Sequence, residues 1–294
     1  MDRRYFLKVM GWSSLFSQWL ARDLWATDQR PVVAVAEGKD HVGITSNAIR
    51  ALGGMKRFVK PGDVVVVKPN IGWDRSPEQG ANTSPAVVWA VVQEAFLAGA
   101  KKVKVFDRSN NDPRRCYVNS GITAALQGLK HVELKHIEDE RFKKVPINGV
   151  YLKEWEIYGE VLSADVFINV AAAKHHGLTK LTLGLKNIMG IMGGDRGRVH
   201  RNIDQALADV NAAVKTHLTI IDATRILTAH GPQGGNLADV KTLNLVIAST
   251  DIVAADAYAT TLFGLKPGDI GATVAAHKRG LGEMDLEKIR ILKV

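Results

Sequence analysis

Short valine- and isoleucine-rich runs alternate with helical patterns along this chain, and that alternation is what most limits the folds it can adopt. Residues 64–67 are consecutive valines, a pattern typical of a strand buried on both faces. Ser84 followed by Pro85 then predicts the start of a helix, which is expected to close at Gly99. The alternation predicts an α/β fold in which helices cover both faces of a mostly parallel sheet.

The same patterns predict the other elements. The predicted strands are 31–36, 64–68, 103–106, 166–170, 218–221, 243–248 and 289–294. The predicted helices are 45–59, 84–98, 119–129, 178–189, 203–215 and 252–263. Residues 132–158 are charged and irregular, and they are expected to form a β excursion over the core. One large domain, or two intimately joined halves, can hold these elements, because the chain has 294 residues.

The N-terminus carries the residues of an export signal. Asp2-Arg3-Arg4-Tyr5-Phe6-Leu7-Lys8 resembles the twin-arginine signal, and a moderately apolar stretch follows. We therefore expect residues 1–26 to be a signal peptide that engages the twin-arginine translocation machinery, and residues 27–294 to be a periplasmic domain. The alternative is a basic N-terminal helix that stays in place and tethers the protein to the membrane face. The apolar stretch is shorter than the roughly 20 residues that a stable transmembrane helix needs.

The composition of the chain limits the ligands that it can bind and the metal sites that it can form. The formal net charge is +9, which permits anionic ligands, but the lysines and arginines are spread along the chain. No nucleic-acid motif accompanies them, so we expect an anionic small molecule rather than a nucleic acid, with a solvated surface as the simpler interpretation of the charge. Cys116 is the only cysteine, so this chain cannot ligate an iron–sulfur cluster of its own. Any metal must be held by nitrogen and oxygen ligands or by a cofactor.

Polar residues stand where five of the predicted strands end. If those strands are parallel, their ends share one edge of the sheet, where ligands bind in folds of this type. The predicted ligand-binding residues at these ends are Lys68, Asn70, Asp107 and Asp222. Asn169 and Ser249 end the other two strands and are expected at the same edge. Each residue taken singly has a simpler interpretation as a helix cap or a turn residue.

Residues 174–200 hold the densest chemistry, with paired histidines, three lysines, two arginines and glycines that let a backbone approach a ligand. The candidate catalytic residues are His176, Lys186 and His200. The candidate anion-binding residues of this segment are Lys174, His175, Lys180 and Arg198. The candidate ligands of a divalent metal are His175, His176 and His200. The simpler alternative is a glycine-rich loop with solvated basic side chains.

These residues resemble the DUF362 family of uncharacterised bacterial and archaeal proteins over nearly all of residues 27–294. The matching stretches are Val67-Lys68-Pro69-Asn70, 165–169, Lys174 to Gly190, 198–200 and 251–256. Many members of the family carry an added cysteine-rich, ferredoxin-like segment with iron–sulfur clusters. This sequence departs from them, because a single cysteine cannot supply the ligands of such a cluster.

The segment is also similar to the N-terminal region of lactate racemase. In that family a lysine ten positions after a histidine bonds covalently to a nickel-pincer nucleotide, and a later histidine is an acid or base. His176 and Lys186 have this spacing and His200 follows, whereas the Asp-Val-Thr-Arg-Pro phosphate motif of that family is absent. The resemblance implies these three positions as a site. It leaves open a divalent metal or a lysine-linked nucleotide as the cofactor.

Three functions agree with these residues. The first is an exported enzyme that acts on an anionic small molecule, with His176 and His200 as acid and base and with lysines for charge. The second is a periplasmic binding or accessory protein that captures an anion, a metal or a cofactor without chemistry. The third is a basic surface that meets an acidic partner subunit. The first two require the paired histidines, Lys186 and His200 to converge on one cavity.

Overall fold

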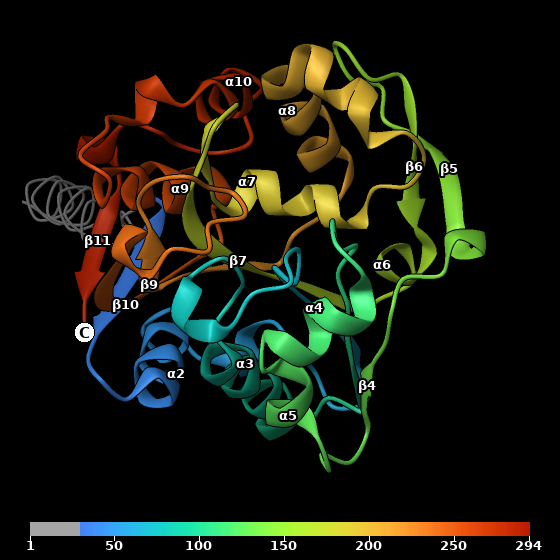
Figure 1. Ribbon diagram of the computed structural model, residues 1–294, viewed down its shortest axis with the longest axis vertical. Coiled ribbons are helices and arrows are strands. Elements are labelled where there is room, and N and C mark those ends of the chain that lie inside the picture. Colours follow the sequence, from blue (N-terminus) through green and yellow to red (C-terminus); the bar gives the residue numbers. More distant parts are fainter. Residues whose placement is uncertain (1–29) are drawn as a thin grey trace, which may run out of the picture. The chain divides into compact units, whose positions relative to one another are not determined.

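A mixed sheet forms the centre of the computed structural model, which describes residues 30–294 (Figure 1). Its strands are β1 (Val32–Glu37), β2 (Val64–Pro69), β3 (Lys102–Val105), β4 (Val132–Leu134), β7 (Val166–His176), β8 (Lys180–Thr182), β9 (Leu218–Leu227), β10 (Val240–Ser249) and β11 (Arg290–Lys293). Their order is β11-β1-β10-β9-β7-β2-β3-β4, and β8 pairs with β7. A separate two-stranded sheet joins β5 (Phe142–Pro146) to β6 (Glu154–Tyr158), so the excursion predicted at 132–158 is confirmed. The predicted leader, residues 1–26, lies outside the described residues.

Most strand pairs of the large sheet are parallel. Pairs β1–β11, β7–β9, β2–β7, β2–β3 and β3–β4 run parallel, and pairs β1–β10, β9–β10 and β7–β8 run antiparallel. The predicted α/β class with a mostly parallel sheet is therefore confirmed. The expected place of Ser249 is wrong, because β10 is antiparallel and sets Ser249 opposite Thr219, near the start of β9. A buried strand has the same apolar pattern in either direction, so the sequence does not reveal this reversal.

Helices cover both faces of the sheet, as predicted (Figure 1). One face packs against α2 (His41–Ala51), α3 (Pro85–Leu97), α4 (Pro113–Asn119) and α5 (Ile122–Leu126). The other packs against α7 (Gly184–Asn187), α8 (Ile203–Ala213), α9 (Ile252–Thr261) and α10 (Gly271–Lys278), and α6 (Gly159–Leu162) follows β6. The short 3-10 helices are η1 (Met55–Arg57), η2 (Pro77–Gln79), η3 (Asp139–Arg141), η4 (Ile188–Ile191), η5 (Arg196–Asn202), η6 (Leu237–Asp239), η7 (Pro267–Asp269) and η8 (Leu286–Lys288). Of the helices in residues 30–294, none is long and apolar enough to cross a membrane.

Alternating side chains of β2 divide the core into two layers. Val65 and Val67 pack in the cluster that contains α3, whereas Val66 packs in the cluster that contains α7 and α8. Successive residues of a strand face opposite sides of the sheet. Lys68 therefore follows Val66 to the side of the sheet that carries α7.

The helix predicted at 178–189 is wrong in most of its length. The chain instead turns back on β7 as a hairpin, in which β8 pairs His175 with Leu181 and His176 with Lys180. Lys180 takes a positive φ of 61°, which interrupts a helix. The two β-branched threonines at 179 and 182 favour an extended chain. Only Gly184–Asn187 is α-helical, and the 3-10 helix η4 continues it.

The helix predicted at 45–59 is divided, and the helix predicted at 119–129 is shortened to α5, with α4 as an additional helix before it. Gly53 and Gly54 take positive φ values of 98° and 78° after α2 has ended, and η1 follows them. Gly121, with a φ of 77°, separates α4 from α5. Glycine adopts this backbone conformation without steric cost, so these positions allow a turn where the apolar spacing alone continues a helix.

Candidate functional site

A cavity of about 370 Å³ lies at the carboxyl ends of three neighbouring strands, β3, β2 and β7. Its other walls come from the loop after β2, from α7 with η4, and from η5. This is the edge at which open parallel sheets bind ligands. The predicted site residues that line this cavity are Lys68, Asn70, Asp107, Lys174, His176, Lys186 and His200.

Three of the predicted residues lie elsewhere, although they neighbour the lining residues in sequence. His175 points away from Lys174 and His176, because side chains of a strand alternate, and its Nδ1 accepts a hydrogen bond from the Gly231 N–H at 3.1 Å. His175 and Lys180 line a second cavity of about 570 Å³. The guanidinium of Arg198 lies over the Trp155 ring, 6.0 Å from its centroid.

Asp222 is buried inside the sheet and does not line the cavity either. Its carboxylate accepts hydrogen bonds from the Ser84 N–H at 2.6 Å and from the N–H and hydroxyl of Thr224 at 2.9 and 2.7 Å. Burial raises the pKa of this carboxyl, although these hydrogen bonds oppose the shift. Asp222 thus fixes the start of α3 against β9, which is a structural role.

The expected metal site is not assembled. Among residues 30–294, no group of three His, Cys, Asp or Glu side chains is placed to hold a metal ion. His175 lines the second cavity and His200 lines the first, so the three imidazoles do not meet in one cavity. The residues present therefore do not fit a divalent metal held by three imidazoles.

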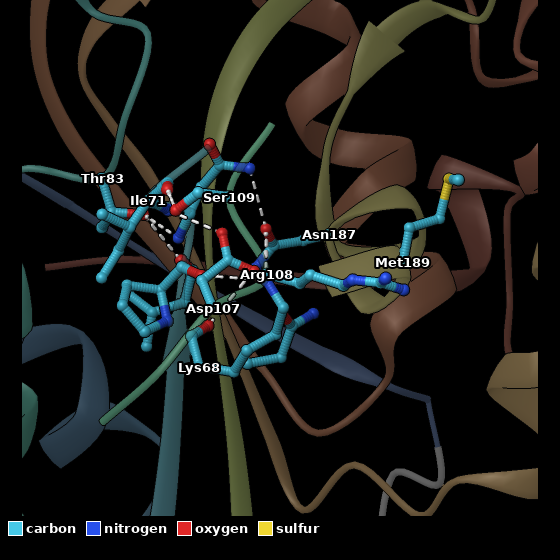
Figure 2. Close-up of polar contacts among 12 residues, drawn as sticks. Lys68, Ile71, Thr83, Asp107, Arg108, Ser109, Asn187 and Met189 are labelled. Carbon is cyan, nitrogen blue, oxygen red and sulfur yellow. Dashed lines mark hydrogen bonds and ion pairs between the residues drawn. The ribbon is translucent and has the colours of Figure 1, made fainter. Parts of the chain in front are cut away.

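Lys68 and Asp107 form a buried ion pair in the wall of the cavity (Figure 2). The Lys68 Nζ lies 2.8 Å from Asp107 Oδ1 and donates to Pro69 O at 2.9 Å and to Asn187 Oδ1 at 3.0 Å. The contact with Asp107 is an ion pair, and the contacts with Pro69 and Asn187 are hydrogen bonds. Burial lowers the pKa of Lys68, and the charge of Asp107 partly offsets the shift. Lys68 is thus held by three protein oxygens in the cavity wall.

Asn187 connects α7 to two strands beneath the cavity. Its Oδ1 accepts from Lys68 and also from Asn70 Nδ2 at 3.0 Å, and its Nδ2 donates to Asn169 Oδ1 at 2.8 Å. Asn169 in turn donates to Gly184 O at 2.9 Å. This amide network holds the short helix in place and so positions the neighbouring Lys186.

Gly190 covers the Lys68–Asp107 pair with bare backbone. A Cβ at this position would collide with the Asp107 carboxylate and with the end of the Lys68 side chain. The Arg108 N–H donates to Gly190 O at 3.1 Å, which holds η4 against the loop after β3. The close approach requires glycine.

Lys174 is 1% exposed and is the second lysine of the cavity. It donates to Asn70 Oδ1 at 3.0 Å and to Ala81 O, both of which are neutral acceptors. Burial lowers the pKa of Lys174 to about 7; the charge of Asp107 opposes this shift, and those of Lys186 and Lys68 add to it.

Lys186 has the least satisfied amine of the three lysines. Its Nζ contacts only Met189 Sδ, at 3.3 Å, and sulfur is a weak acceptor. Burial and the positive charge of Arg196 lower the pKa of Lys186 to about 8. Arg196 itself donates to two neutral oxygens, the backbone carbonyl of Arg108 and Asn110 Oδ1, both at 3.3 Å. In the part of the chain described, no carboxylate oxygen lies within 4.0 Å of Lys174, Lys186 or Arg196.

The backbone fixes the two cavity histidines in opposite tautomers. His176 Nδ1 accepts from the N–H groups of Leu178 and Thr179 at 3.1 and 3.4 Å, so its proton is on Nε2. His200 Nδ1 lies 3.1 Å from Arg196 O, and a carbonyl only accepts, so Nδ1 carries a proton and the neutral imidazole has its lone pair on Nε2. Burial and then the charges of Lys186 and Lys174 lower the pKa of His176 to about 3. His176 is therefore a neutral donor, and His200 is an acceptor.

Sequence reasoning missed several residues that line the cavity, namely Arg108, Asn187, Gly190 and Arg196. Asn187 and Gly190 lie inside the segment already singled out at 174–200. Arg196 begins the 3-10 helix η5 that also carries Arg198 and His200. No spacing in the sequence distinguishes Arg196 from Arg198.

Comparison with known proteins places the chain in a family. Residues 65–261 match the family described as Domain of unknown function (DUF362). The chain belongs to the DUF362 family. The stretches from Lys68 to Asn70 and from Lys174 to Gly190, which build most of the cavity, lie within this match.

The DUF362 chain is also similar to individual proteins. It is 29% identical over 241 residues to the thylakoid-associated protein sll1697 of Synechocystis, covering 79% of this chain and 73% of that protein. A crystal structure from Thermotoga maritima has the same fold, with a TM-score of 0.51 and 14% identity over 78% of this chain and 60% of that one. The lactate racemase apoprotein of Thermoanaerobacterium thermosaccharolyticum aligns with a TM-score of 0.47 and 11% identity over 77% and 56% of the chains. The chain thus spans less than two thirds of either solved protein.

Proposed function

We propose that this DUF362 protein is an enzyme that acts on an anionic small molecule in the cavity at the carboxyl ends of β3, β2 and β7. One observation carries the proposal: Lys174, Lys186 and Arg196 reach this cavity without a carboxylate partner among the described residues. The carboxylate of Asp107 also lines it, but this group pairs with Lys68. Buried cations without counter-ions favour an anionic ligand.

The two histidines then have different chemical roles. His200 Nε2 has a lone pair and is the base that accepts a proton from the substrate. His176 Nε2–H donates a hydrogen bond to an oxygen on which negative charge develops, as a neutral imidazole can do without losing its own proton. Abstraction of a proton beside a carboxylate fits this pair, with the cations binding the carboxylate.

A hydrogen-exchange assay tests this chemistry. The protein is incubated in D₂O with a panel of small carboxylic acids, and NMR follows the loss of hydrogen at the carbon beside the carboxylate. We expect exchange with the wild type and with His175→Ala, whose side chain faces the second cavity, and at least about a hundredfold slower exchange with His200→Ala. Equal rates for His200→Ala and the wild type would remove His200 from the chemistry.

The alternative function is a binding or accessory protein that holds an anion without converting it. The same cations serve both functions, so the histidines discriminate between them. A binder keeps its affinity in His200→Gln and shows no exchange in any carboxylic acid that it binds. That combination favours the accessory function over the enzyme.

Export and a cofactor remain part of the proposal. If residues 1–26 direct the protein to the twin-arginine machinery, Arg3→Lys with Arg4→Lys leaves it in the cytoplasm instead of the periplasm, which fractionation measures. A leader that is not cleaved would leave the full chain attached to the membrane fraction.

A lysine-linked nucleotide would attach at Lys186, the cavity lysine with a free amine. The intact mass of protein isolated from its own host reports such an adduct.

A further inference from the structure

The three cavity lysines differ in the hydrogen bonds and ion pairs that each would lose if its amine formed a covalent bond. An ammonium group that becomes an iminium exchanges two of its three N–H hydrogens for a carbon–nitrogen double bond. At Lys174 this loss would leave Asn70 Oδ1 or Ala81 O buried without a donor, which is costly. At Lys68 it would also break the ion pair with Asp107.

Lys186 loses almost nothing by the same reaction. Its Nζ gives up only the contact with Met189 Sδ. Its side chain is half-buried and lines the cavity, so a small molecule that enters the cavity can reach the amine. Of the three lysines, Lys186 is therefore the one that can form a covalent bond without disrupting the protein.

The groups around Lys186 select the kind of carbonyl compound. Arg196 bears a positive charge close enough to Lys186 to lower its pKa, and a guanidinium suits a carboxylate. His176 Nε2–H can donate to the carbonyl oxygen, and the charge of Lys186 acts on His176. His200 Nε2 in the same cavity can accept a proton. A cation, a neutral donor and a base around one amine fit a compound that carries both a carboxylate and a carbonyl.

We propose that Lys186 forms an imine with the carbonyl carbon of a small 2-oxo acid or an aldehyde acid. This deepens the proposed function and rests on it, because the carboxylate must first bind in the cavity. It names the substrate class, an anionic carbonyl compound, and it assigns Lys186 the role of nucleophile.

The reaction needs no oxidant or reductant. His200 Nε2 takes one proton from the Lys186 ammonium, and the free amine attacks the carbonyl carbon. The carbon–nitrogen bond forms, and the carbonyl π electrons move to oxygen, which takes a second proton from nitrogen. The hydroxyl then leaves as water with the proton that His200 returns, and the nitrogen lone pair forms the double bond. The net change is ammonium plus carbonyl to iminium plus water.

The state of the amine agrees with this role. The pKa of Lys186 is about 8 instead of 10.5. At pH 8 about half of its amine is free, against roughly one part in 300 for an unperturbed lysine. The lower basicity reduces the intrinsic reactivity of the amine, so we expect a net advantage of about tenfold over an ordinary solvent-exposed lysine.

Reductive trapping tests the proposal. The full-length protein is incubated at pH 8 with glyoxylate or with pyruvate in the presence of cyanoborohydride, which reduces an imine to a stable secondary amine. Intact mass spectrometry counts the adducts, and peptide mass spectrometry locates them. We expect one dominant adduct on Lys186, formed about tenfold faster than on any other lysine, and slowed by sulfate. Lys186→Arg, which keeps the charge, should lose this fast adduct, whereas Lys180→Arg should keep it.

The outcomes distinguish the imine at Lys186 from the proposed function on which it rests. Equal labelling of all lysines, or a dominant adduct on Lys174, overturns the imine at Lys186. If sulfate binds in the cavity and no fast adduct forms with either compound, the imine is overturned and the proposed function stands. If sulfate does not bind and no fast adduct forms, both are overturned.

Discussion

Lys68, Lys174 and Lys186 reach the same cavity but have different numbers of hydrogen-bond acceptors. Lys68 has three oxygen acceptors, Lys174 has two and Lys186 has only a thioether. Lys68 and Lys174 follow predicted strands, and Lys186 lies in the segment 174–200 that the sequence singles out, so the sequence could place all three at a site. It could not rank them, because the ranking depends on acceptors such as Asn187 Oδ1 and Ala81 O, which lie far away in the chain.

The buried ion pair gives a first prediction. Asp107→Asn leaves the ammonium of Lys68 buried without a counter-charge, so we expect a loss of about 3–5 kcal/mol in the free energy of unfolding. Urea denaturation measures it. Adding Lys68→Met to the variant should recover part of the loss, because no uncompensated charge then remains. A loss below about 1 kcal/mol in the single variant would show that Lys68 is not charged in the folded protein.

Gly190 gives a second prediction at the same scale. Gly190→Ala forces a methyl group against the Lys68–Asp107 pair, and we expect a loss of about 1–3 kcal/mol in unfolding free energy and weaker anion binding. Gly177→Ala is the matched control, since the nearest atom to its added Cβ is 3.9 Å away. Denaturation curves for the two variants that coincide would contradict the close approach at Gly190.

At the scale of elements, strand β7 decides which residues meet. Its alternation sends Lys174 to the first cavity and His175 to the second, whereas His176, at the end of the strand, borders both. The hairpin with β8 then leads the chain to α7. The sequence predicted the strand at 166–170 but not its continuation to His176. The leucines at 178, 181 and 185 have helical spacing, and the same residues also fit a hairpin followed by a short helix. Pairing with β7, which is a tertiary contact, selects the hairpin.

The amide network beneath α7 gives a prediction at this scale. Asn187→Ala removes the links from α7 to β2 and β7, so we expect a loss of about 1–3 kcal/mol in unfolding free energy and a lower anion affinity, because Lys186 is no longer held in place. Asn47→Ala, on the exposed face of α2, should change the stability by less than about 0.5 kcal/mol. Unchanged anion affinity in Asn187→Ala would show that the network does not position Lys186.

At the scale of the whole molecule, the fold gathers cations at one edge of a sheet and lowers their pKa values, those of Lys174 and Lys186 among them. The alternation of strands and helices predicted the fold class and therefore this edge. It did not predict the reversal of β10, because a strand buried on both faces has the same composition in either direction. The two lowered lysine pKa values depend on burial and on neighbouring charges, which only the assembled sheet creates.

The lowered pKa of Lys174 makes stability depend on pH in a defined direction. The folded protein releases this proton above pH 7 or so, whereas the unfolded chain keeps it up to about pH 10.5. The unfolded state therefore binds more protons across this range, and the stability of the wild type relative to Lys174→Met should rise with pH. Denaturation of both proteins at pH 7 and pH 9.5 measures the difference. A difference that stays constant or falls would contradict a lowered pKa.

Anion binding shifts the protonation equilibrium of these lysines in the opposite direction, because a bound anion stabilises their charged form. Binding should take up protons near pH 7.5, and the affinity should fall as the pH rises through the pKa values of Lys174 and Lys186, about 7 and 8. Calorimetry in two buffers that differ in ionisation enthalpy measures the proton uptake.

The central claim is that an anion binds to the unpaired cations of this cavity, and a sulfate titration tests it most directly. Isothermal calorimetry compares the wild type with two double variants that remove the same charges. Lys186→Met with Arg196→Met should weaken sulfate binding by at least about tenfold. Lys180→Met with Arg198→Met, whose side chains lie outside this cavity, should bind as the wild type does. Equal sulfate affinity in the two double variants would contradict the claim.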